Sequence, residues 1–220
     1  MTRLKHFYWF VVALHLGLLW WLPFFPSQDG ACHVYNTVIL RDLMNGGMAY
    51  GQFFDLELFF TPNLGAAVPL YLLTAFLPPV MAEKVFLSLF IVLLAGVMPL
   101  LARLAGNAAY PASFVIFPLL FSRMTMPGFY SFMLGVPLWL WAMWLFWQMR
   151  DRPLWQRLLA GNGCALVLFA CHLLPFACYV LSIGCALVVM SLTRKNFVAR
   201  WREALALLAL PLLLLAGYGW

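Results

Sequence analysis

The sequence predicts an all-α protein: a polytopic transmembrane helical bundle with an outer-face loop that carries juxtamembrane helices, forming a single membrane domain over residues 1–220. The first observation is composition, because the chain is 65% hydrophobic and 9% charged, with a mean hydropathy of +0.94. A soluble domain is about half apolar, with roughly a quarter of its residues charged. The second is that several apolar runs approach the ~20 residues that cross ~30 Å of hydrocarbon. The third is that these runs are continuous, whereas the strands of a membrane β-barrel alternate in polarity.

The first predicted span covers residues 7–25. Arg3 and Lys5 precede it, and basic residues favour the cytoplasmic side of a membrane. Phe25 and Pro26 end the run without the small-residue site at which a signal peptide is cleaved. We therefore expect an uncleaved span with the N-terminus in the cytoplasm, in a multi-pass protein of the cytoplasmic (inner) membrane.

The next apolar segment, 63–80, is predicted not to cross. It contains Pro69, Pro78 and Pro79, and proline breaks helices. If the segment crossed, nine of the thirteen basic residues would lie on the wrong face. If it lies in or dips into the outer interface, ten of the thirteen are cytoplasmic. The three that then remain outside are Arg41, Lys84 and Arg123.

The later spans are predicted at 82–102, 108–122, 127–148, 158–172, 174–192 and 204–218. The run from 158 to 192 would be ~52 Å long as one helix at ~1.5 Å per residue, too long for one crossing. Arg157 and Arg194 at its two ends both favour the cytoplasm, so we expect a hairpin with its tip near His172. The chain stops at Trp220 inside an apolar segment, and we expect a protein that is incomplete at its C-terminus.

The outer loop with its interfacial helices, residues 26–80, is the predicted site. It holds four of the seven acidic residues, Asp29, Asp42, Asp55 and Glu57, and ionisable groups beside a membrane span indicate function. Residues 31–44 have few helix breakers and predict an interfacial helix, which ends at Asn45-Gly46-Gly47. At ~3.6 residues per turn, the polar arc of this helix comprises His33, Asn36, Thr37 and Arg41.

The candidate residues each have a structural and a functional interpretation. Asp29 is either an N-cap that accepts hydrogen bonds from first-turn amides, or a carboxylate at the membrane–water boundary that deprotonates an acceptor hydroxyl. Arg123 either binds the phosphate of an outer-leaflet lipid carrier or anchors the chain at the interface. The remaining candidates are either substrate contacts or ordinary structural and solvated polar groups: His33, Asp55, Glu57 and His172.

Several other classes of site are excluded. The chain has no phosphate-binding glycine loop, no His-Glu-x-x-His zinc motif and no serine-nucleophile elbow. Its basic residues lie between hydrophobic runs, where they set topology rather than bind nucleic acid. The cysteines at 164, 171, 178 and 185 lie in apolar segments, and we expect buried thiols rather than metal ligands. No metal site and no cofactor are predicted.

Five short segments, in this order along the chain, carry a family resemblance: Pro26–Asn36, Thr61–Gly65, Ala82–Lys84, Gly128–Gly135 and His172–Phe176. With one span, an acidic outer loop, a Pro-rich interfacial helix and a series of short spans, the chain resembles the N-terminal half of bacterial integral-membrane glycosyltransferases of the GT-C type. The resemblance covers nearly all 220 residues. It implies an enzyme that moves a sugar from a polyprenyl-phosphate-linked donor to an acceptor at the outer face.

The resemblance also implies residue roles. In this class the first-loop carboxylate is the catalytic base or positions the acceptor, which corresponds to Asp29 here. His33 and Asn36 would then contact the acceptor, with Arg123 or His172 near the donor phosphate. The expected partners are the polyprenyl-phosphate-linked sugar, membrane lipids and a glycan, lipid or protein acceptor.

Two departures and one alternative accompany this hypothesis. Asp29 is flanked by Gln28 and Gly30, where many relatives have paired acids, and the second outer loop has Arg123 and no carboxylate. A divalent metal is therefore not supported. The alternative, from another class, is a non-catalytic polytopic membrane scaffold or transporter-like subunit, although the spans carry almost none of the ionisable residues that mark a transporter.

Overall fold

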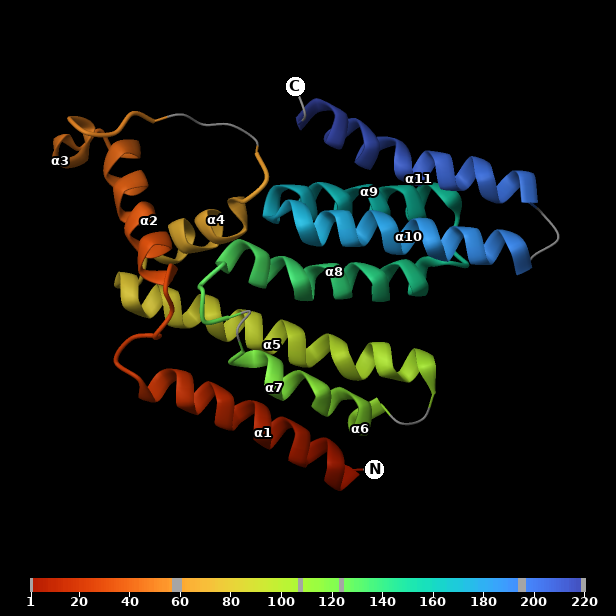
Figure 1. Cartoon of the computed structure of the whole chain (residues 1–220), viewed down its shortest axis with the longest axis horizontal. Helices are drawn as coiled ribbons and strands as arrows, with labels where there is room; N and C mark the ends of the chain where they lie inside the picture. Colours follow the sequence, from red (N-terminus) through yellow and green to blue (C-terminus); the bar gives the residue numbers. More distant parts are fainter. Residues whose placement is uncertain (1, 57–60, 107–108, 123–124, 194–196, 219–220) are drawn as a thin grey trace.

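The computed structural model describes residues 2–56, 61–106, 109–122, 125–193 and 197–218, and these are helices and their connecting loops. Helix α1 lies along one side of α5, and α11 packs on the α9–α10 pair at the other side of the molecule (Figure 1). Glu57 and Arg123 fall outside the described residues. The elements are α1 (Thr2–Trp21), α2 (Gly30–Met44), α3 (Met48–Gly51), α4 (Leu64–Leu73), α5 (Pro79–Ala105), α6 (Ala109–Ser113), η1 (Phe114–Ile116), α7 (Phe117–Leu120), α8 (Tyr130–Met149), α9 (Leu154–Cys171), α10 (Leu173–Thr193) and α11 (Phe197–Tyr218).

Four helices of the described chain are long and apolar enough to cross a membrane, as judged by length and composition. They are the helical stretches Pro79–Leu104, Tyr130–Met149, Leu154–Cys171 and Leu173–Met190. Each corresponds to a span predicted from the sequence. Proline begins two of them: Pro79 opens α5 and Pro153 precedes α9, positions where the missing amide proton costs no intrahelical hydrogen bond.

The predicted span 108–122 differs in the structure. It forms three short pieces, α6, η1 and α7, and the stretch Ala109–Leu120 is a shorter apolar helix. At ~1.5 Å per residue it is ~18 Å long, against ~30 Å of hydrocarbon. Pro118 lies within it, and the amide donor that this proline lacks would have bonded the carbonyl of Phe114, where the 3₁₀ turn η1 begins.

Segment 63–80 does not form a helix of spanning length. Helix α4 has 10 residues, or ~15 Å, and is followed by turns up to Pro78. Serial backbone bonds close these turns, with Thr74 N donating to Leu70 O at 2.8 Å and Leu77 N to Leu73 O at 3.0 Å. The side of the membrane on which α4 lies stays a prediction.

Cysteine labelling tests that topology. On a Cys-free background, Leu104→Cys at the end of α5 should react with an impermeant maleimide from the cytoplasmic side, and Phe129→Cys before α8 from the outer side. Both side chains are exposed on the protein, 41% and 53%, so neither probe is buried by other parts of the chain. Labelling with the two sides reversed, or on one common side, would contradict the topology.

The helix predicted over 31–44 is confirmed as α2, Gly30–Met44, while its position at the membrane interface stays a prediction. It ends where expected, because Asn45 N bonds Arg41 O at 3.1 Å and Gly46 has a φ of 71°, a left-handed backbone that glycine adopts without strain.

The predicted polar arc of α2 is not a single solvent-facing surface, which corrects the expectation from the helical wheel. Arg41 donates to Thr74 Oγ1 at 3.3 Å and to the carbonyl of Tyr71, whose ring lies 4.5 Å from the guanidinium carbon. Thr37 is 2% exposed. These two residues therefore lie in the packed part of the structure, while Asn36 is exposed.

The predicted break near His172 is confirmed. Helix α9 ends at Cys171 and α10 begins at Leu173, and the two lie side by side with their shared tip toward α4 (Figure 1). His172 at the break has extended backbone, with φ −168° and ψ 139°. Tyr179 Oη donates to Gly161 O at 2.9 Å and joins the two arms.

Two buried clusters hold the helices together. The first joins α1, α4, α5 and α8, and the second joins α8, α9, α10 and α11. The end of α1 is attached to α5 by Lys84, which is 5% exposed and donates to Leu22 O at 2.6 Å. Helix α8 takes part in both clusters, so it links the helices of the first cluster to those of the second.

Candidate functional site

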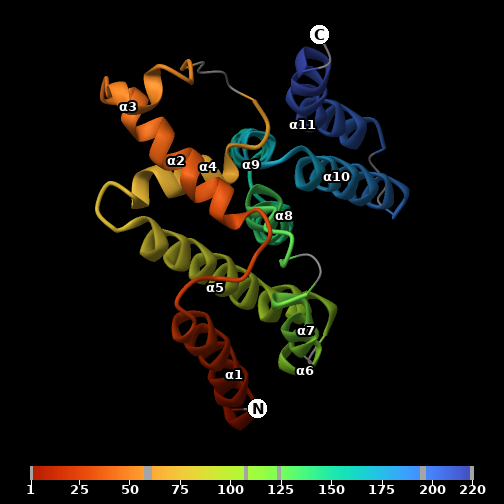
Figure 2. The same ribbon diagram turned by 60° about the vertical axis from the view of Figure 1, so that its left-hand side comes forward.

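The N-terminal end of α2 meets the beginnings of α5 and α8 at one end of the helical array (Figures 1 and 2). The loop before α2 pairs there with the loop before α8. Gln28 N donates to Met126 O at 2.9 Å, and Asp29 N donates to Pro127 O at 3.0 Å. Gly128 has a φ of +82°, and a Cβ at this position would lie 2.6 Å from Gly30 N. The close approach of the two loops therefore requires glycine.

Asp29 occupies the N-cap position of α2, but its side chain makes no capping hydrogen bond. The first-turn amide is satisfied by another residue, because Gly30 N donates to Ser27 Oγ at 3.1 Å. The capping interpretation of Asp29 is therefore wrong. Its carboxylate, half-buried beside the paired loops, is left for another role.

A chain of hydrogen bonds connects this loop to α5. Tyr130 Oη donates to Glu83 Oε1 at 2.5 Å, and Ser27 Oγ lies 3.2 Å from Tyr130 Oη. Because the Tyr130 proton goes to Glu83, Ser27 donates its own proton to Tyr130 and accepts from Gly30. Glu83 and Tyr130 are 5% and 0% exposed. The network holds the start of α2 against α5 and α8.

Glu83 has no assigned role in the sequence prediction, although Ala82–Lys84 is one of the five segments of the resemblance. The available signal is that Glu83 is an acid within an apolar run, which by default indicates a functional or partnered group. Tyr130 and Ser27 carry no such signal, because serine and tyrosine are common in loops and at helix ends.

His33 lies one turn into α2 and packs on the same network. Its ring stacks on Tyr130 with centroids 5.3 Å apart and an interplanar angle of 19°. Burial lowers the pKa of His33, partly offset by the Asp29 carboxylate and by a hydrogen bond to the backbone of Gly128. The imidazole is therefore neutral near pH 7, and it presents a polar ring beside Asp29 without a positive charge.

This lowered pKa predicts a pH dependence of stability. The unfolded chain has the ordinary histidine pKa of 6.5 and binds the proton more readily than the folded chain. The free energy of unfolding is therefore at its full value above the histidine pKa of the unfolded chain, and it decreases as the pH drops below that pKa. Thermal unfolding of the purified protein from about pH 8 to about pH 5 should show this loss, and His33→Gln should reduce it. If the stability of His33→Gln depends on pH as strongly as that of the parent protein, another titrating group causes the dependence.

A second set of contacts brings the remaining segments to the same end. Ser131 Oγ accepts from Ala66 N at 3.0 Å and donates to Asn63 O at 3.0 Å. Ser131 O accepts from Cys171 Sγ at 3.3 Å. Gly65 leaves no room for a side chain beside Cys171, and Gly135 leaves none beside Pro175. All five segments of the resemblance therefore meet through direct contacts, although they are widely separated in the sequence.

The other predicted site residues lie as follows. Asn36 is exposed, one turn beyond His33, so at ~3.6 residues per turn it shares a helix face with Asp29 and His33. Asp55 is exposed and follows α3, which lies at the opposite end of α2, ~22 Å away along the helix. The structure does not bring Asp55 to Asp29.

His172 lies at the tip of the α9–α10 hairpin, 5.6 Å from the Phe132 ring between centroids. Its Nδ1 accepts from Leu174 N at 3.1 Å. Burial lowers its pKa. A neutral imidazole that accepts at Nδ1 carries its proton on Nε2, and that atom is then a donor for an anionic group.

The described residues contain no group of three or more His, Cys, Asp or Glu side chains that could hold a metal ion. The five cysteines are free thiols.

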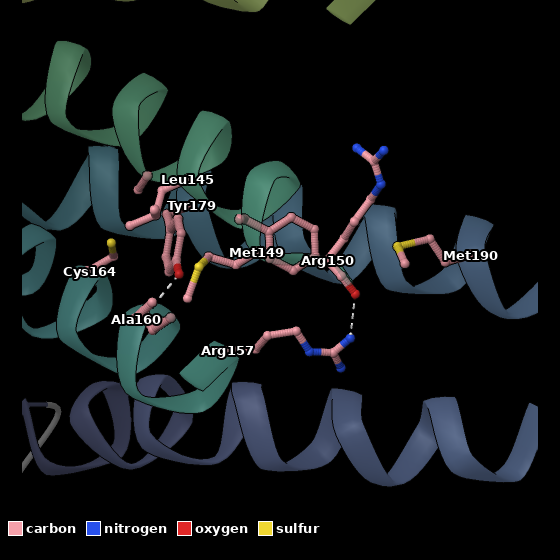
Figure 3. Close-up of a pocket in the computed structure, with 11 residues that line it drawn as sticks. Leu145, Met149, Arg150, Arg157, Ala160, Cys164, Tyr179 and Met190 are labelled. Atoms are coloured by element: carbon pink, nitrogen blue, oxygen red, sulfur yellow. Dashed lines mark hydrogen bonds between the residues drawn. The ribbon is translucent and has the colours of Figure 1, made fainter. Parts of the chain in front are cut away.

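A separate, small pocket lies between α8, α9 and α10 (Figure 3). Arg157 Nη1 donates to Arg150 O at 2.9 Å at its edge, and Cys164 and Met149 line it. Its volume is about 10 Å³, roughly what one water molecule needs. An apolar cavity of about 390 Å³ beside it is lined by Trp141, Leu145 and other apolar groups of α8 and α9.

Comparisons of the chain with protein families, with curated sequences and with solved structures give no match. The chemistry available at the α2 end is a carboxylate without a capping bond, a neutral imidazole beside it and an exposed amide on the same helix face. These groups can accept a proton from a hydroxyl and hydrogen-bond a polyol.

Proposed function

We propose that the chain belongs to a membrane glycosyltransferase, which moves a sugar from a polyprenyl-phosphate-linked donor to an acceptor at the outer face of the cytoplasmic membrane. The observation that carries the proposal is the Asp29 carboxylate at the start of α2, which makes no capping bond. The loop that holds it pairs with the loop before α8 and is tied to α5 through Ser27, Tyr130 and Glu83. A carboxylate held beside a neutral imidazole and an exposed amide is suited to take a proton from a hydroxyl.

The position of the site at the ends of helices suits a substrate of mixed character. Helices α5 and α8 are long and apolar enough to cross a membrane, and their beginnings lie beside the start of α2 (Figure 2). A polyprenyl chain is apolar and belongs in the hydrocarbon, while its phosphate and sugar belong in water. A site at the boundary meets both requirements.

The proposed reaction is a displacement at the anomeric carbon. The acceptor hydroxyl oxygen attacks this carbon, and the bond between the carbon and the phosphate oxygen breaks. The electron pair of that bond leaves with the polyprenyl phosphate, and the acceptor proton passes to the Asp29 carboxylate. General-base assistance of this kind contributes about 10²–10⁴ in rate. No nucleotide takes part at that face.

The remaining residues take supporting roles in the proposal. His33 and Asn36, on the same helix face as Asp29, contact the acceptor. His172 donates from Nε2 to the donor phosphate, and Arg123 supplies positive charge there. Asp55, in the more distant part of the outer loop, contacts the acceptor beyond its reacting hydroxyl, and Glu57 is proposed as a further substrate contact. Glu83, Tyr130 and Ser27 are positioning residues, because they act through the Asp29 loop.

The test uses membranes that contain the full chain, with their own lipids and glycans as acceptors. A panel of radiolabelled sugars is supplied as polyprenyl-phosphate donors, and the same sugars are supplied as nucleotide derivatives in parallel. We expect label to enter an acceptor from a polyprenyl-phosphate donor and not directly from the nucleotide form. Transfer from none of the polyprenyl donors would contradict the proposal and favour the scaffold alternative.

A further inference from the structure

A third cavity lies at the opposite end of the molecule from Asp29. It has a volume of about 580 Å³ and opens between the first turn of α1, the last turn of α5 and the beginning of α6. Helix α5 has 27 residues, so its two ends, one at the Asp29 site and one at this cavity, are ~40 Å apart. The cavity is therefore independent of the proposed sugar transfer.

The described lining of this cavity carries positive charge and no acid. Lys5 comes from α1 and Arg103 from the last turn of α5. The one ion pair found among the described residues is Arg150 with Asp151, in another part of the chain. Both cations are exposed, and neither has a carboxylate partner in the described structure. Two uncompensated cations facing one cavity favour an anionic occupant.

The wall behind these cations is apolar and firmly packed. Tyr110 lines the cavity, and its ring contacts Tyr8 with centroids 5.6 Å apart. Tyr8 is 0% exposed and donates to Ala95 O at 2.8 Å. Leu4 and Pro111 add apolar surface. A wall that is already ordered loses little conformational entropy when a ligand binds.

We propose that this cavity binds the headgroup of an anionic phospholipid from the adjoining membrane leaflet. The phosphodiester lies between Lys5 and Arg103, and the glycerol and first acyl carbons lie against Leu4 and Pro111. Charge complementarity selects an anion, and the apolar wall at the end of two membrane-associated helices selects a lipid over a small soluble ion. Basic pockets between helices at a membrane surface bind such headgroups.

The test uses the purified full chain in detergent, titrated with phosphatidylglycerol or with zwitterionic phosphatidylcholine, and bound lipids are counted by native mass spectrometry. We expect one phosphatidylglycerol to bind more tightly than phosphatidylcholine. Lys5→Gln and Arg103→Gln should each weaken that site about fivefold, the effect of one basic residue near an anionic lipid surface. Arg152→Gln, which removes one charge from the exposed turn between α8 and α9, is the matched control and should bind as the parent does.

Three results would overturn the proposal. Equal weakening by Arg152→Gln would show that overall charge, and not the cavity, attracts the lipid. Unchanged binding in both cavity variants would show that neither cation contacts the lipid. Displacement of the lipid by an equal concentration of inorganic phosphate would assign the cavity to a soluble anion. Thermal unfolding of each variant shows whether it is folded, and two separate cavity variants keep the test valid if one is not.

Discussion

Replacement of Asp29 by asparagine is expected to lower sugar transfer by about 10²–10⁴-fold, the contribution of a general base, while the protein folds and inserts normally. Asparagine has the shape of aspartate but cannot take up a proton. The structure sharpens the expectation, because the Asp29 side chain makes no capping bond that the change could weaken. Transfer from the polyprenyl-phosphate donor in membranes is the measurement, with protein amount and thermal unfolding recorded for each variant.

Two companion variants separate chemistry from structure. Asp151→Asn is the matched control, because Asp151 is 72% exposed and pairs only at the surface with Arg150, where such pairs contribute little. Ser27→Ala removes the acceptor of the Gly30 amide and should cost about 0.5–2 kcal/mol of stability, as for other helix caps. Full transfer activity in Asp29→Asn would remove Asp29 from the mechanism and favour the non-catalytic scaffold.

Gly128→Ala is expected to destabilise the protein by about 2–5 kcal/mol. Roughly 1–2 kcal/mol comes from a left-handed backbone in a residue with a side chain, and about 1–3 kcal/mol from overpacking. The new methyl group would lie 2.6 Å from Gly30 N and 3.0 Å from Asp29 N. These are backbone atoms that no rotamer change can move, so the two loops must separate. Thermal or denaturant unfolding of the purified protein measures the loss.

Substitutions at two other glycines separate the backbone strain in Gly128→Ala from its overpacking. Gly46→Ala has the same kind of backbone, with a φ of +71°, but nothing within 4 Å of the new Cβ, so it should cost only the backbone strain. Gly184→Ala, in the middle of α10, also has open space and should be neutral or slightly stabilising, since alanine favours a helix over glycine. A Gly128→Ala protein no less stable than Gly46→Ala would show that the paired loops are not as tightly packed as the structure indicates.

Helix α2 and the break at His172 could both be predicted because their causes are local. Residues 31–44 lack helix breakers, and the Asn45-Gly46-Gly47 stop acts on the adjacent backbone alone. The 158–192 run is too long for one crossing whatever surrounds it. The segment 108–122 shows the limit of hydropathy, since its apolar content predicted a span while Pro118 interrupted the regular helix.

The candidate site was predicted only in part. Asp29, His33 and Asn36 were identified because polar residues beside a membrane span stand out in an apolar chain. The role of Asp29 was left open between an N-cap and a catalytic carboxylate, and only the fold shows that Ser27 accepts the bond from the first-turn amide. The distance of Asp55 from Asp29 likewise depends on the direction of α2.

The sequence by itself determined the elements whose causes lie within a few residues or in composition: the apolar helices, helix α2, its stop and the concentration of acids in residues 26–80. The tertiary structure alone decided which of these residues meet. The contacts of Glu83 with Tyr130, of Gly128 with Gly30, and of Ser131 with Asn63 and Cys171 join segments far apart in the chain. Such partners are selected by the packing of whole helices, because a buried polar group must find a hydrogen bond wherever the fold places it.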